Sequence, residues 1–412
     1  MVTIDLVYFN AGGGHLAAAR ALEETIRRQR RPWNVRLVNL FEILDPNGVF
    51  ERLTGMKPEG YYNARLASGW TIGLGRELRV LQALIRLWQG ALVARLSSHW
   101  RATRPDLVVS LVPNFNRVMH DALAQARPGV AYATVLTDLA DFPPHFWIEP
   151  GTSQHLICGT ARALEQARAA GCDPRHLHAT SGMILRPEFY RAAPFDRAAA
   201  MRELGLDPAR PTGFVMFGGH GSRAMRLVAA RLRDRQLVLV CGHNAALAAR
   251  LRAAPAPAPR VVVGFTPRIS ELMRVADYFI GKPGPGSLSE ALQVGLPVIV
   301  ARNAWTMPQE RYNTEWIEEN GVGLVLDSFR SIRAAVDATI TRLDAYRRRI
   351  ATIRNVAVFE VPGILARLIA DGAARGADPA CGDYVAGRGA PAWADRRRDI
   401  TLHRAPGTAS CC

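Results

Sequence analysis

Short apolar runs alternate with helical stretches along most of the chain, and this alternation restricts the fold more than any other feature. In the first half we expect strands at residues 3–9, 35–40, 107–112, 131–137 and 155–159. The pattern restarts in the second half, with strands expected at 213–217, 237–241, 261–265, 278–281, 297–301 and 323–326. Strands that alternate with helices form parallel sheets with helices on both faces. The sequence therefore predicts an α/β protein with two doubly wound, Rossmann-like domains.

A proline-rich stretch at residues 183–211 separates the two series of strands and is the expected linker. The chain has 412 residues, which is more than one hydrophobic core usually occupies. We expect a first domain at 1–190 and a second at 191–370. The tail at 371–412 is rich in Gly, Ala, Pro and Arg and lacks apolar periodicity, so we expect it to be disordered.

The chain is strongly basic, and nearly all of its positive charge is arginine. Lysine and arginine number 52 against 36 acidic residues, which gives a net charge of +16, and Lys57 and Lys282 are the only lysines. Guanidinium groups suit phosphate and phosphoglyceride headgroups. The charge indicates either an anionic partner or a coding bias towards arginine with a solvated surface, and by itself it names no function.

The six cysteines form no C-x-x-C pair and no metal-ligand spacing with histidine, which favours a reducing cytosol. The first residues have no basic leader and do not resemble a signal peptide. No uncharged apolar run reaches the ~18 residues that a membrane span requires. We therefore expect a soluble or peripheral protein.

Residues 65–104 interrupt the alternation of strands and helices. This segment carries seven arginines and one glutamate, interleaved with tryptophans and leucines at helical spacing. Two interpretations remain open. The segment is either a helix packed on the first sheet, or an interfacial helix whose Trp and Leu side chains enter a membrane while its arginines meet anionic headgroups.

A glycine-rich loop follows the first expected strand. It reads Asn10-Ala11-Gly12-Gly13-Gly14-His15 and leads directly into a helix. Glycines present backbone amides at a helix N-terminus, where the dipole favours negative charge. The loop also fits a relaxed dinucleotide-binding pattern, but the acidic residue expected at the end of the second strand is missing, which makes a dehydrogenase the weakest candidate.

The second domain repeats this arrangement with Gly218-Gly219-His220-Gly221-Ser222 after its first strand. A further loop, Lys282-Pro283-Gly284-Pro285-Gly286-Ser287, precedes a helix that carries Glu290. A carboxylate at that position is placed to accept hydrogen bonds from vicinal ribose hydroxyls. Locally, a capping box of Ser287 with Glu290 fits the spacing equally well.

Taken together, these motifs resemble the monogalactosyldiacylglycerol synthase family and, more distantly, the N-acetylglucosaminyltransferase that makes lipid II. The resemblance covers roughly residues 1–345 and is densest between 264 and 323. It is carried by Gly12-Gly13-Gly14-His15, Thr137-Asp138-Leu139, Gly264-Phe265, Ala276-Asp277, 282–287, Glu290-Ala291, Gly295-Leu296-Pro297, Gln309-Glu310, Asn313 and Gly321-Val322-Gly323.

The resemblance implies a glycosyltransferase B fold, in which the two domains face each other across a cleft, and an inverting enzyme that uses a UDP-sugar and no other cofactor. The second domain would bind the donor through Gly218, Gly219, Gly221, Ser222, Gly264, Phe265, Thr266, Pro283, Gly284, Gly286, Ser287, Glu290, Gln309, Glu310 and Asn313. The first domain would bind the lipid acceptor and an anionic membrane surface through Gly13, Gly14, Trp70, Arg79, Arg86 and Trp88. We expect no nucleic-acid partner.

His15 and Asp138 would face the anomeric carbon of the sugar. Inversion requires a base for the acceptor hydroxyl, and we favour His15, with Asp138 either orienting it or acting as the base itself. The chain has no D-x-D triplet to hold a divalent ion, so we expect transfer without a metal. Amides of the glycine loops, with Arg223 or Arg302, would neutralise the diphosphate instead.

The favoured function is transfer of a hexose from a UDP-sugar to diacylglycerol or another lipid on the cytoplasmic face of a bacterial plasma membrane. A UDP-sugar epimerase on the same fold and a catalytically silent nucleotide- or lipid-binding protein are the alternatives. The loop before Gln309 reads Thr306-Met307-Pro308 where the family tends to have Pro-Gly, so the identity of the sugar stays open.

Overall fold

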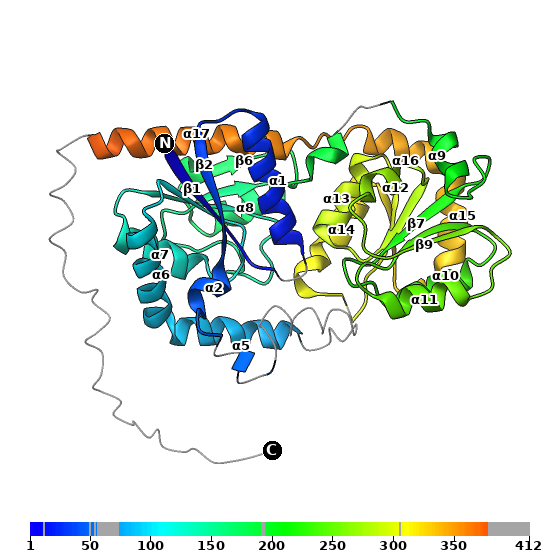
Figure 1. The fold of residues 1–412 in the computed structure, drawn as a ribbon, viewed down its shortest axis with the longest axis horizontal. Coiled ribbons are helices and arrows are strands. Elements are labelled where there is room, and N and C mark those ends of the chain that lie inside the picture. The colour runs from blue at the N-terminus through cyan, green and yellow to red at the C-terminus, as the bar shows by residue number, and fades with distance from the viewer. Residues whose placement is uncertain are drawn as a thin grey trace, which may run out of the picture.

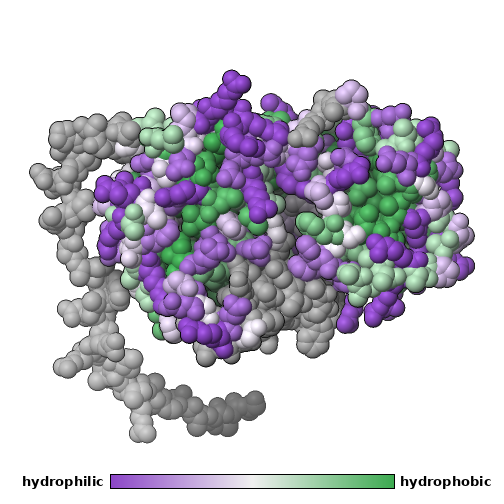
Figure 2. All heavy atoms as spheres, viewed as in Figure 1, coloured by the Kyte–Doolittle hydropathy of each residue, from purple (hydrophilic) through white to green (hydrophobic). Residues whose placement is uncertain are grey.

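The computed structural model describes residues 1–10, 13–48, 51–52, 55, 74–190, 194–304 and 306–377. It consists of two α/β domains that lie side by side, each built around a parallel sheet (Figure 1). Figure 2 shows a largely hydrophilic surface, with apolar residues visible between the helices of both domains.

The first domain has a six-stranded sheet in the order β2-β1-β3-β4-β5-β6. Ile4 of β1 pairs with Val35 on one side and Leu107 on the other, and these three neighbouring strands run parallel. The strands are β1 Val2–Tyr8, β2 Trp33–Asn39, β3 Leu107–Ser110, β4 Ala131–Val135, β5 His155–Cys158 and β6 Leu177–Ala179. The helices are α1 Gly14–Arg28, α2 Leu40–Leu44, α5 Leu74–Leu87, α6 Gln89–Thr103, α7 Asn116–Ala126 and α8 Ala161–Ala169, with 3-10 turns η1 Pro174–His176 and η2 Pro187–Tyr190.

The second domain has a six-stranded sheet in the order β12-β11-β10-β7-β8-β9. Its strands are β7 Thr212–Met216, β8 Gln236–Val240, β9 Arg260–Val263, β10 Tyr278–Gly281, β11 Val298–Ala301 and β12 Gly323–Leu326. The helices are α9 Arg197–Glu203, α10 Ala224–Arg231, α11 Ala245–Ala253, α12 Ile269–Arg274, α13 Pro285–Gln293, α14 Arg311–Asn320, α15 Ile332–Thr341 and α16 Leu343–Ile350, with 3-10 turns η3 Pro308–Glu310 and η4 Phe329–Ser331.

The predicted fold class is confirmed, and every expected strand forms within about two residues of its predicted bounds. The sequence pattern missed β6. It is only three residues long and lies at the sheet edge, where its sequence Leu-His-Ala leaves too few apolar residues to produce a visible pattern.

The last described helix, α17 Ala357–Ala377, returns from the second domain and packs on the first (Figure 1). Val361 and Leu365 are fully buried in the same cluster as Ile4 and Leu22. The predicted second domain, 191–370, therefore ends within a helix that belongs to the core of the first. Residues 371–377 continue this helix, and 378–412 lie outside the described residues.

Two chain segments lie against each other where the domains connect. The carboxylate of Glu360, on α17, accepts hydrogen bonds from the backbone N–H and the hydroxyl of Ser181, at 2.7 and 2.9 Å. The Ser181 hydroxyl also accepts from the backbone N–H of Val356. At Gly182 a Cβ atom would lie 2.6 Å from the side chain of Asn355, so the close approach of the two segments requires glycine there.

The described part of the basic segment, residues 74–104, forms two helices, and each of the two interpretations fits part of it. In α6, Leu96 and Trp100 are buried against the first domain. In α5, Ile85 is buried but Val80, Leu81 and Leu84 are exposed, followed by Leu87 at 77% and Trp88 at 62% exposure. Trp70 lies outside the described residues. Within the described part of the chain, no helix is long and apolar enough to cross a bilayer.

The return of α17 can be tested by replacing Leu365 with Ala. We expect the cavity to cost about 2–5 kcal/mol, and we expect hydrogen exchange to accelerate in β1 and β3. Arg367→Ala, on the exposed face of the same helix, should stay within about 0.5 kcal/mol of wild type. Accelerated exchange confined to β7 and β10 would contradict this packing.

Candidate active site between the domains

The carboxyl ends of the strands in both sheets carry the residues singled out by sequence. After β1 the chain turns at Gly13, whose φ of +80° favours glycine, and enters α1. No side chain caps α1, and a Cβ at Gly13 or Gly14 would meet no atom within 4 Å. The N-terminus of α1 points towards the second domain (Figure 1), so its amides are available to a ligand between the domains.

His15 is the second residue of α1, and neighbouring side chains fix its ring. Its Nδ1 lies 3.2 Å from the hydroxyl of Thr137, and a backbone hydrogen bond links it to Leu111. The ring also packs against Phe9 and Trp147. Burial lowers the pKa of His15 to about 4, partly offset by the Leu111 hydrogen bond. The imidazole is therefore neutral at physiological pH.

Asp138, one residue beyond Thr137, is buried beside this ring. Its Oδ2 accepts a hydrogen bond from the indole N–H of Trp147 at 3.0 Å. Burial raises the pKa of Asp138 to about 7, while the Trp147 hydrogen bond acts in the opposite direction. In the following turn a different carboxylate, that of Asp141, accepts from the backbone N–H groups of His145 and Trp147.

A lysine and a glutamate of the second domain are close enough to influence Asp138. Glu310 raises the pKa of Asp138 and Lys282 lowers it, which places both charges opposite the carboxyl group. Lys282 donates from Nζ to Oε1 of Glu310 at 2.6 Å, and Glu310 is only 4% exposed. The structure therefore brings His15 and Asp138 of the first domain together with this ion pair of the second.

The glycine loop after β7 has the conformation that its sequence predicts. Gly218 and Gly221 have φ values of +75° and +62°, where L side chains are strained. Backbone packs directly on backbone next to the loop, because a Cβ at Gly242 would lie 2.0 Å from the carbonyl oxygen of Gly219. Gly218 also faces Lys282, whose Cε lies 3.5 Å from a Cβ built on it. The loop thus brings backbone amides and an ammonium group together.

An aromatic platform lies beside this loop. Phe265, at the end of β9, is 67% exposed and stacks on His243 with ring centroids 4.2 Å apart and planes 18° apart. His220 of the glycine loop lies 5.8 Å beyond His243. Thr266, which follows Phe265, accepts a hydrogen bond from the backbone N–H of Arg268 through its hydroxyl. A flat, exposed ring next to backbone amides suits a nucleobase with an attached phosphate.

Glu290 pairs with an arginine from the linker. Its Oε1 accepts from Nε and a terminal nitrogen of Arg186 at 3.3 and 3.2 Å. Burial raises the pKa of Glu290 and Arg186 lowers it. The capping-box alternative is wrong: α13 begins at Pro285 with Gly284 as its N-cap, so Glu290 lies beyond the first turn, and Ser287 donates to the Gly284 carbonyl.

The remaining predicted donor residues surround the start of α13. Gly284 lies against the Lys282–Glu310 pair, and a Cβ at Gly286 would meet nothing within 4 Å. Asn313 is fully buried and donates to the Pro283 carbonyl at 2.7 Å, so it fixes the loop. Among the described residues, the buried Oε1 of Gln309 has no hydrogen-bond partner, which leaves an acceptor for a hydroxyl.

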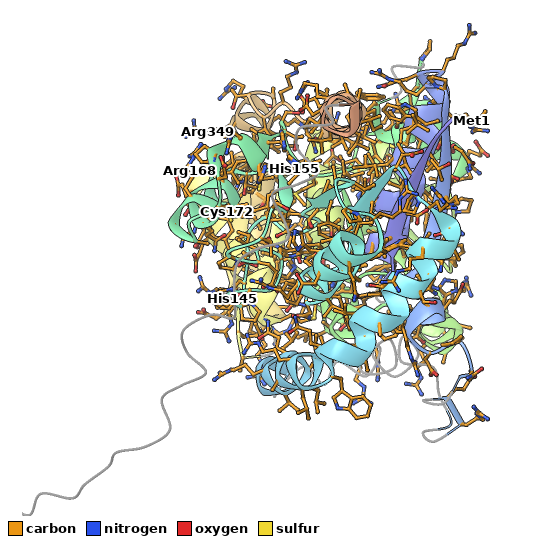
Figure 3. The ribbon with its side chains drawn as sticks, turned by 90° about the vertical axis from the view of Figure 1, so that its left-hand side faces the viewer. Met1, His145, His155, Arg168, Cys172 and Arg349 are labelled. Atoms are coloured by element: carbon orange, nitrogen blue, oxygen red, sulfur yellow. The ribbon has the colours of Figure 1, made fainter. Side chains whose placement is uncertain are left out.

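Three of the predicted acceptor residues, Arg79, Arg86 and Trp88, lie on or directly after α5, whereas Gly13 and Gly14 lie at the start of α1. A pocket of about 500 Å³ is lined by Gln82, Ile85, Arg86, Gln89, Asn114, Arg117, Val118, Asp121, His145, Glu149 and Pro150. Gln82 donates to Asn114 in the loop after β3 and to the carbonyl of His145 in the loop after β4, which attaches α5 to both loops. His145 is labelled in Figure 3. Arg79 and Trp88 are exposed on the outer side of α5.

Sequence reasoning gave no role to Thr137, Trp147, Arg186 or His243. Thr137 belongs to the motif Thr137-Asp138-Leu139 and could have been noticed, whereas the other three reach the site through tertiary packing. Arg302, suggested for the diphosphate, pairs with Glu315 at 2.8 Å instead. Within the described ranges, no three His, Cys, Asp or Glu side chains gather as a metal site would require.

The environment of Asp138 predicts a pH-dependent stability difference. Because its pKa is raised from 3.8 to about 7 on folding, the folded state holds a proton that the unfolded state has lost, and stability falls as pH rises from about 4 to 7. Asp138→Asn removes this loss. The unfolding free energy of the variant minus that of wild type should therefore be about 2–4 kcal/mol larger at pH 8 than at pH 4. Urea denaturation at several pH values measures the difference, and a gap that does not change with pH would refute the assignment.

Comparison with known proteins connects this site to a family. Residues 214–367 match the model of the glycosyltransferase family 28 C-terminal domain. The chain is 27% identical over 349 residues to "Probable monogalactosyldiacylglycerol synthase 2, chloroplastic" of Oryza sativa subsp. indica, covering 76% of this chain and 68% of that protein. It is 30% identical over 246 residues to the monogalactosyldiacylglycerol synthase of Spinacia oleracea, covering 57% and 46%.

Solved structures share the fold. The glycosyltransferase of kitacinnamycin superposes with a TM-score of 0.54 at 17% identity, covering 89% of this chain and 98% of that one. MurG of Acinetobacter baumannii superposes with a TM-score of 0.53 at 12% identity, covering 89% and 100%. Residues 214–367 thus match the glycosyltransferase family 28 C-terminal domain, the chain is similar to monogalactosyldiacylglycerol synthases, and its fold is the glycosyltransferase B fold.

Proposed function

We propose that this protein transfers a hexose from a UDP-sugar to a membrane lipid, with diacylglycerol as the favoured acceptor and with inversion at the anomeric carbon. The observation that carries the proposal is the convergence of two half-sites: His15 and Asp138 at the end of one sheet, and glycine loops with Lys282 at the end of the other. The similarity to galactolipid synthases supports the lipid acceptor.

The donor is proposed to lie along the second sheet. Its uracil would stack on Phe265, whose ring His243 supports, and its diphosphate would lie over the loop 218–222. Glu290 would accept from the ribose hydroxyls, with Arg186 keeping the carboxylate charged and oriented. Gln309 and Glu310 would contact the sugar, and Asn313 would position the Pro283 loop.

Lys282 is the proposed counter-charge for the departing diphosphate. It lies between Gly218 and Gly284, and Gly284 is the N-cap of α13, whose start has no side-chain cap and whose dipole also favours an anion. These groups would do what a divalent ion does in other nucleotide-sugar enzymes, so we propose that transfer needs no metal. This arrangement replaces Arg302, which is held by Glu315, as the neutralising group.

His15 is the proposed base. A diphosphate in the cleft raises the pKa of nearby groups, because it stabilises their protonated forms. For His15 this moves the pKa up from about 4 towards the range useful for a base. For Asp138 it moves the pKa up from about 7, so that the carboxyl group is protonated at neutral pH and cannot accept the proton. Thr137 and the Leu111 backbone, rather than Asp138, would orient the imidazole.

The acceptor is proposed to enter beside α5. The exposed Val80, Leu84, Leu87 and Trp88 would enter the acyl boundary of a bilayer, with Arg79 and Arg86 at the headgroups. The pocket at Arg86 would receive the polar end of the lipid. The protein would then act as a peripheral enzyme at the inner face of a plasma membrane.

The direct test is a UDP-release assay with UDP-galactose, UDP-glucose and UDP-N-acetylglucosamine, each with and without diacylglycerol in anionic micelles. We expect release to depend on both donor and lipid, and full rate to persist in excess EDTA. A rate restored only by added manganese or magnesium would defeat the metal-free mechanism. UDP release at the same rate with and without diacylglycerol would exclude this lipid as the acceptor.

His15→Ala should reduce kcat by about 10²–10⁴-fold, because the base is lost. UDP affinity by calorimetry should remain within about twofold of wild type, because His15 belongs to the opposite domain. Thr137→Val serves as the positioning control: it keeps the base but removes its Nδ1 partner, so a smaller fall in kcat is expected. A loss of UDP binding in His15→Ala would overturn the division of labour between domains.

Glu290→Ala should weaken UDP binding about 10- to 100-fold, the usual cost of losing charged hydrogen bonds. Glu188→Ala is the matched control, because Glu188 pairs with the same Arg186 at 3.0 Å but lies in η2 rather than in α13. Its UDP affinity should stay close to that of wild type. Equal losses in both variants would mean that Arg186, and not Glu290, meets the nucleotide.

A further inference from the structure

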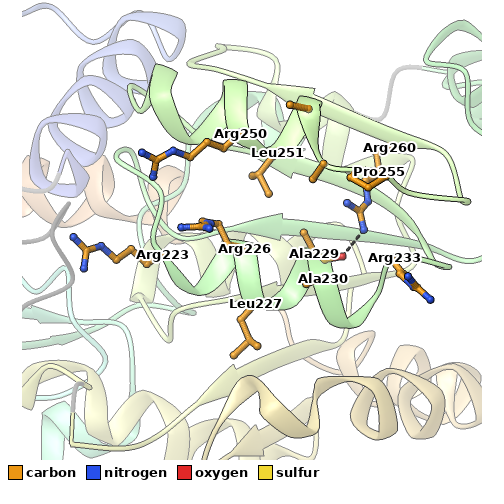
Figure 4. A pocket seen from close by; sticks show the side chains of 12 residues that line it. Arg223, Arg226, Leu227, Ala229, Ala230, Arg233, Arg250, Leu251, Pro255 and Arg260 are labelled. Atoms are coloured by element: carbon orange, nitrogen blue, oxygen red, sulfur yellow. Dashed lines mark hydrogen bonds between the residues drawn. The ribbon is translucent and has the colours of Figure 1, made fainter.

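An arginine-rich groove lies on the second domain between α10 and α11. Its volume is about 870 Å³, within the range of ordinary ligand sites. Five arginines line it: Arg223, Arg226, Arg233, Arg250 and Arg260. Figure 4 shows Arg223, Arg226 and Arg250 towards one end and Arg233 and Arg260 towards the other. No aspartate or glutamate is among its lining residues.

The groove's positive charge is uncompensated within the described residues. Arg260 is half-buried and uses a terminal nitrogen to donate to the Ala229 carbonyl, so it fixes the wall. Arg226, Arg233 and Arg250 are exposed, and none of them pairs with an acidic side chain in the described ranges, whereas Arg235, Arg302 and Arg333 of the same domain do. Like charges held this close repel each other unless an anion lies between them.

The floor of the groove is apolar. Leu251 and Ala229 are buried beneath it, and Leu227, Ala230 and Pro255 complete the lining. Over α10 and α11 the surface accordingly alternates between hydrophilic and apolar residues (Figure 2). A guanidinium rim above an apolar floor matches a ligand that combines a phosphate with aliphatic carbon.

The helices that flank the groove and helix α5 lie along the same edge of the molecule. In Figure 1, α5 of the first domain and α10 and α11 of the second all lie along the lower edge. One flat surface could therefore contact both. This common orientation favours a phosphate that belongs to a membrane over one in solution.

We infer that the α10–α11 groove binds the phosphate of an anionic phospholipid headgroup and so forms a second membrane contact, on the donor-binding domain. The inference rests on the proposed membrane association, and it adds an electrostatic contact on the second domain to the headgroup contacts of Arg79 and Arg86. Arginine forks recognise phosphate oxygens in pairs, and five such groups exceed what α5 presents with Arg79 and Arg86.

The test uses the full chain and sedimentation with vesicles of phosphatidylcholine containing 0, 20 or 40% phosphatidylglycerol. The test variant is Arg226→Gln with Arg250→Gln. The matched control is Arg202→Gln with Arg348→Gln, which removes the same charge from exposed positions on α9 and α16 at the opposite edge of the domain (Figure 1). UDP affinity serves as the check of folding for both.

We expect the groove variant to lose about 10- to 30-fold in partition onto 40% phosphatidylglycerol vesicles, as two surface arginines should contribute. Its partition onto phosphatidylcholine alone should not change, and the control should lose less than about threefold. Equal losses in the two double variants would mean that only net charge matters and would overturn the groove. An unchanged partition of the groove variant would overturn it as well.

Two further measurements distinguish this inference from a failure of the α5 contact and from the binding of a soluble phosphate. The double variant Leu84→Ser with Trp88→Ser should lower partition onto all vesicles alike. If it has no effect, while the groove variant still loses the additional partition that phosphatidylglycerol produces, only the α5 contact is refuted. Titration with sn-glycerol 3-phosphate by calorimetry should show no saturable binding below about 1 mM. Tight binding of that probe, abolished in the groove variant, would assign the groove to a soluble phosphate and refute the lipid.

Discussion

The return of α17 to the first domain is the constraint on which the active site depends. In each parallel sheet, loops at the carboxyl ends of the strands carry the functional residues, as expected for this architecture. Those loops form one site only if the two edges face each other. Because Val361 and Leu365 are buried in the first core while residues 181–182 and 355–360 bind each other, the chain crosses twice at one place, and the domains are held edge to edge.

Burial then gives the facing groups their chemistry. The same loss of water that keeps His15 neutral keeps a proton on Asp138 near pH 7, so the first domain presents little charge of its own. On the opposite side Glu310 largely neutralises Lys282. A bound diphosphate would shift this balance by attracting Lys282 and raising both pKa values. The cleft is thus more responsive to an anionic ligand than its formal charges indicate.

The sequence predicted the two sheets well, because apolar runs of strand length are a local signal. It also located the glycine loops, since positive φ at Gly13, Gly218 and Gly221 requires residues that the chain supplies. It failed where the outcome depended on contacts between distant residues. α17 packs on the first domain, Arg186 pairs with Glu290, and Trp147 donates to Asp138. These contacts join residues that are 9 to several hundred positions apart, and no pattern within a short window encodes them.

The segment 65–104 shows why an amphipathic pattern alone cannot distinguish core from interface. α6 uses its apolar face for the core, whereas α5 buries Ile85 and leaves Leu87 and Trp88 in solvent, although both helices have similar composition. Under our proposals the first domain would contact the bilayer chiefly through these apolar side chains, and the second through arginines. The apolar contact is insensitive to salt and the arginine contact is not. Lipid charge would therefore act mainly on the domain that carries the donor, and so on how that domain is held relative to the acceptor.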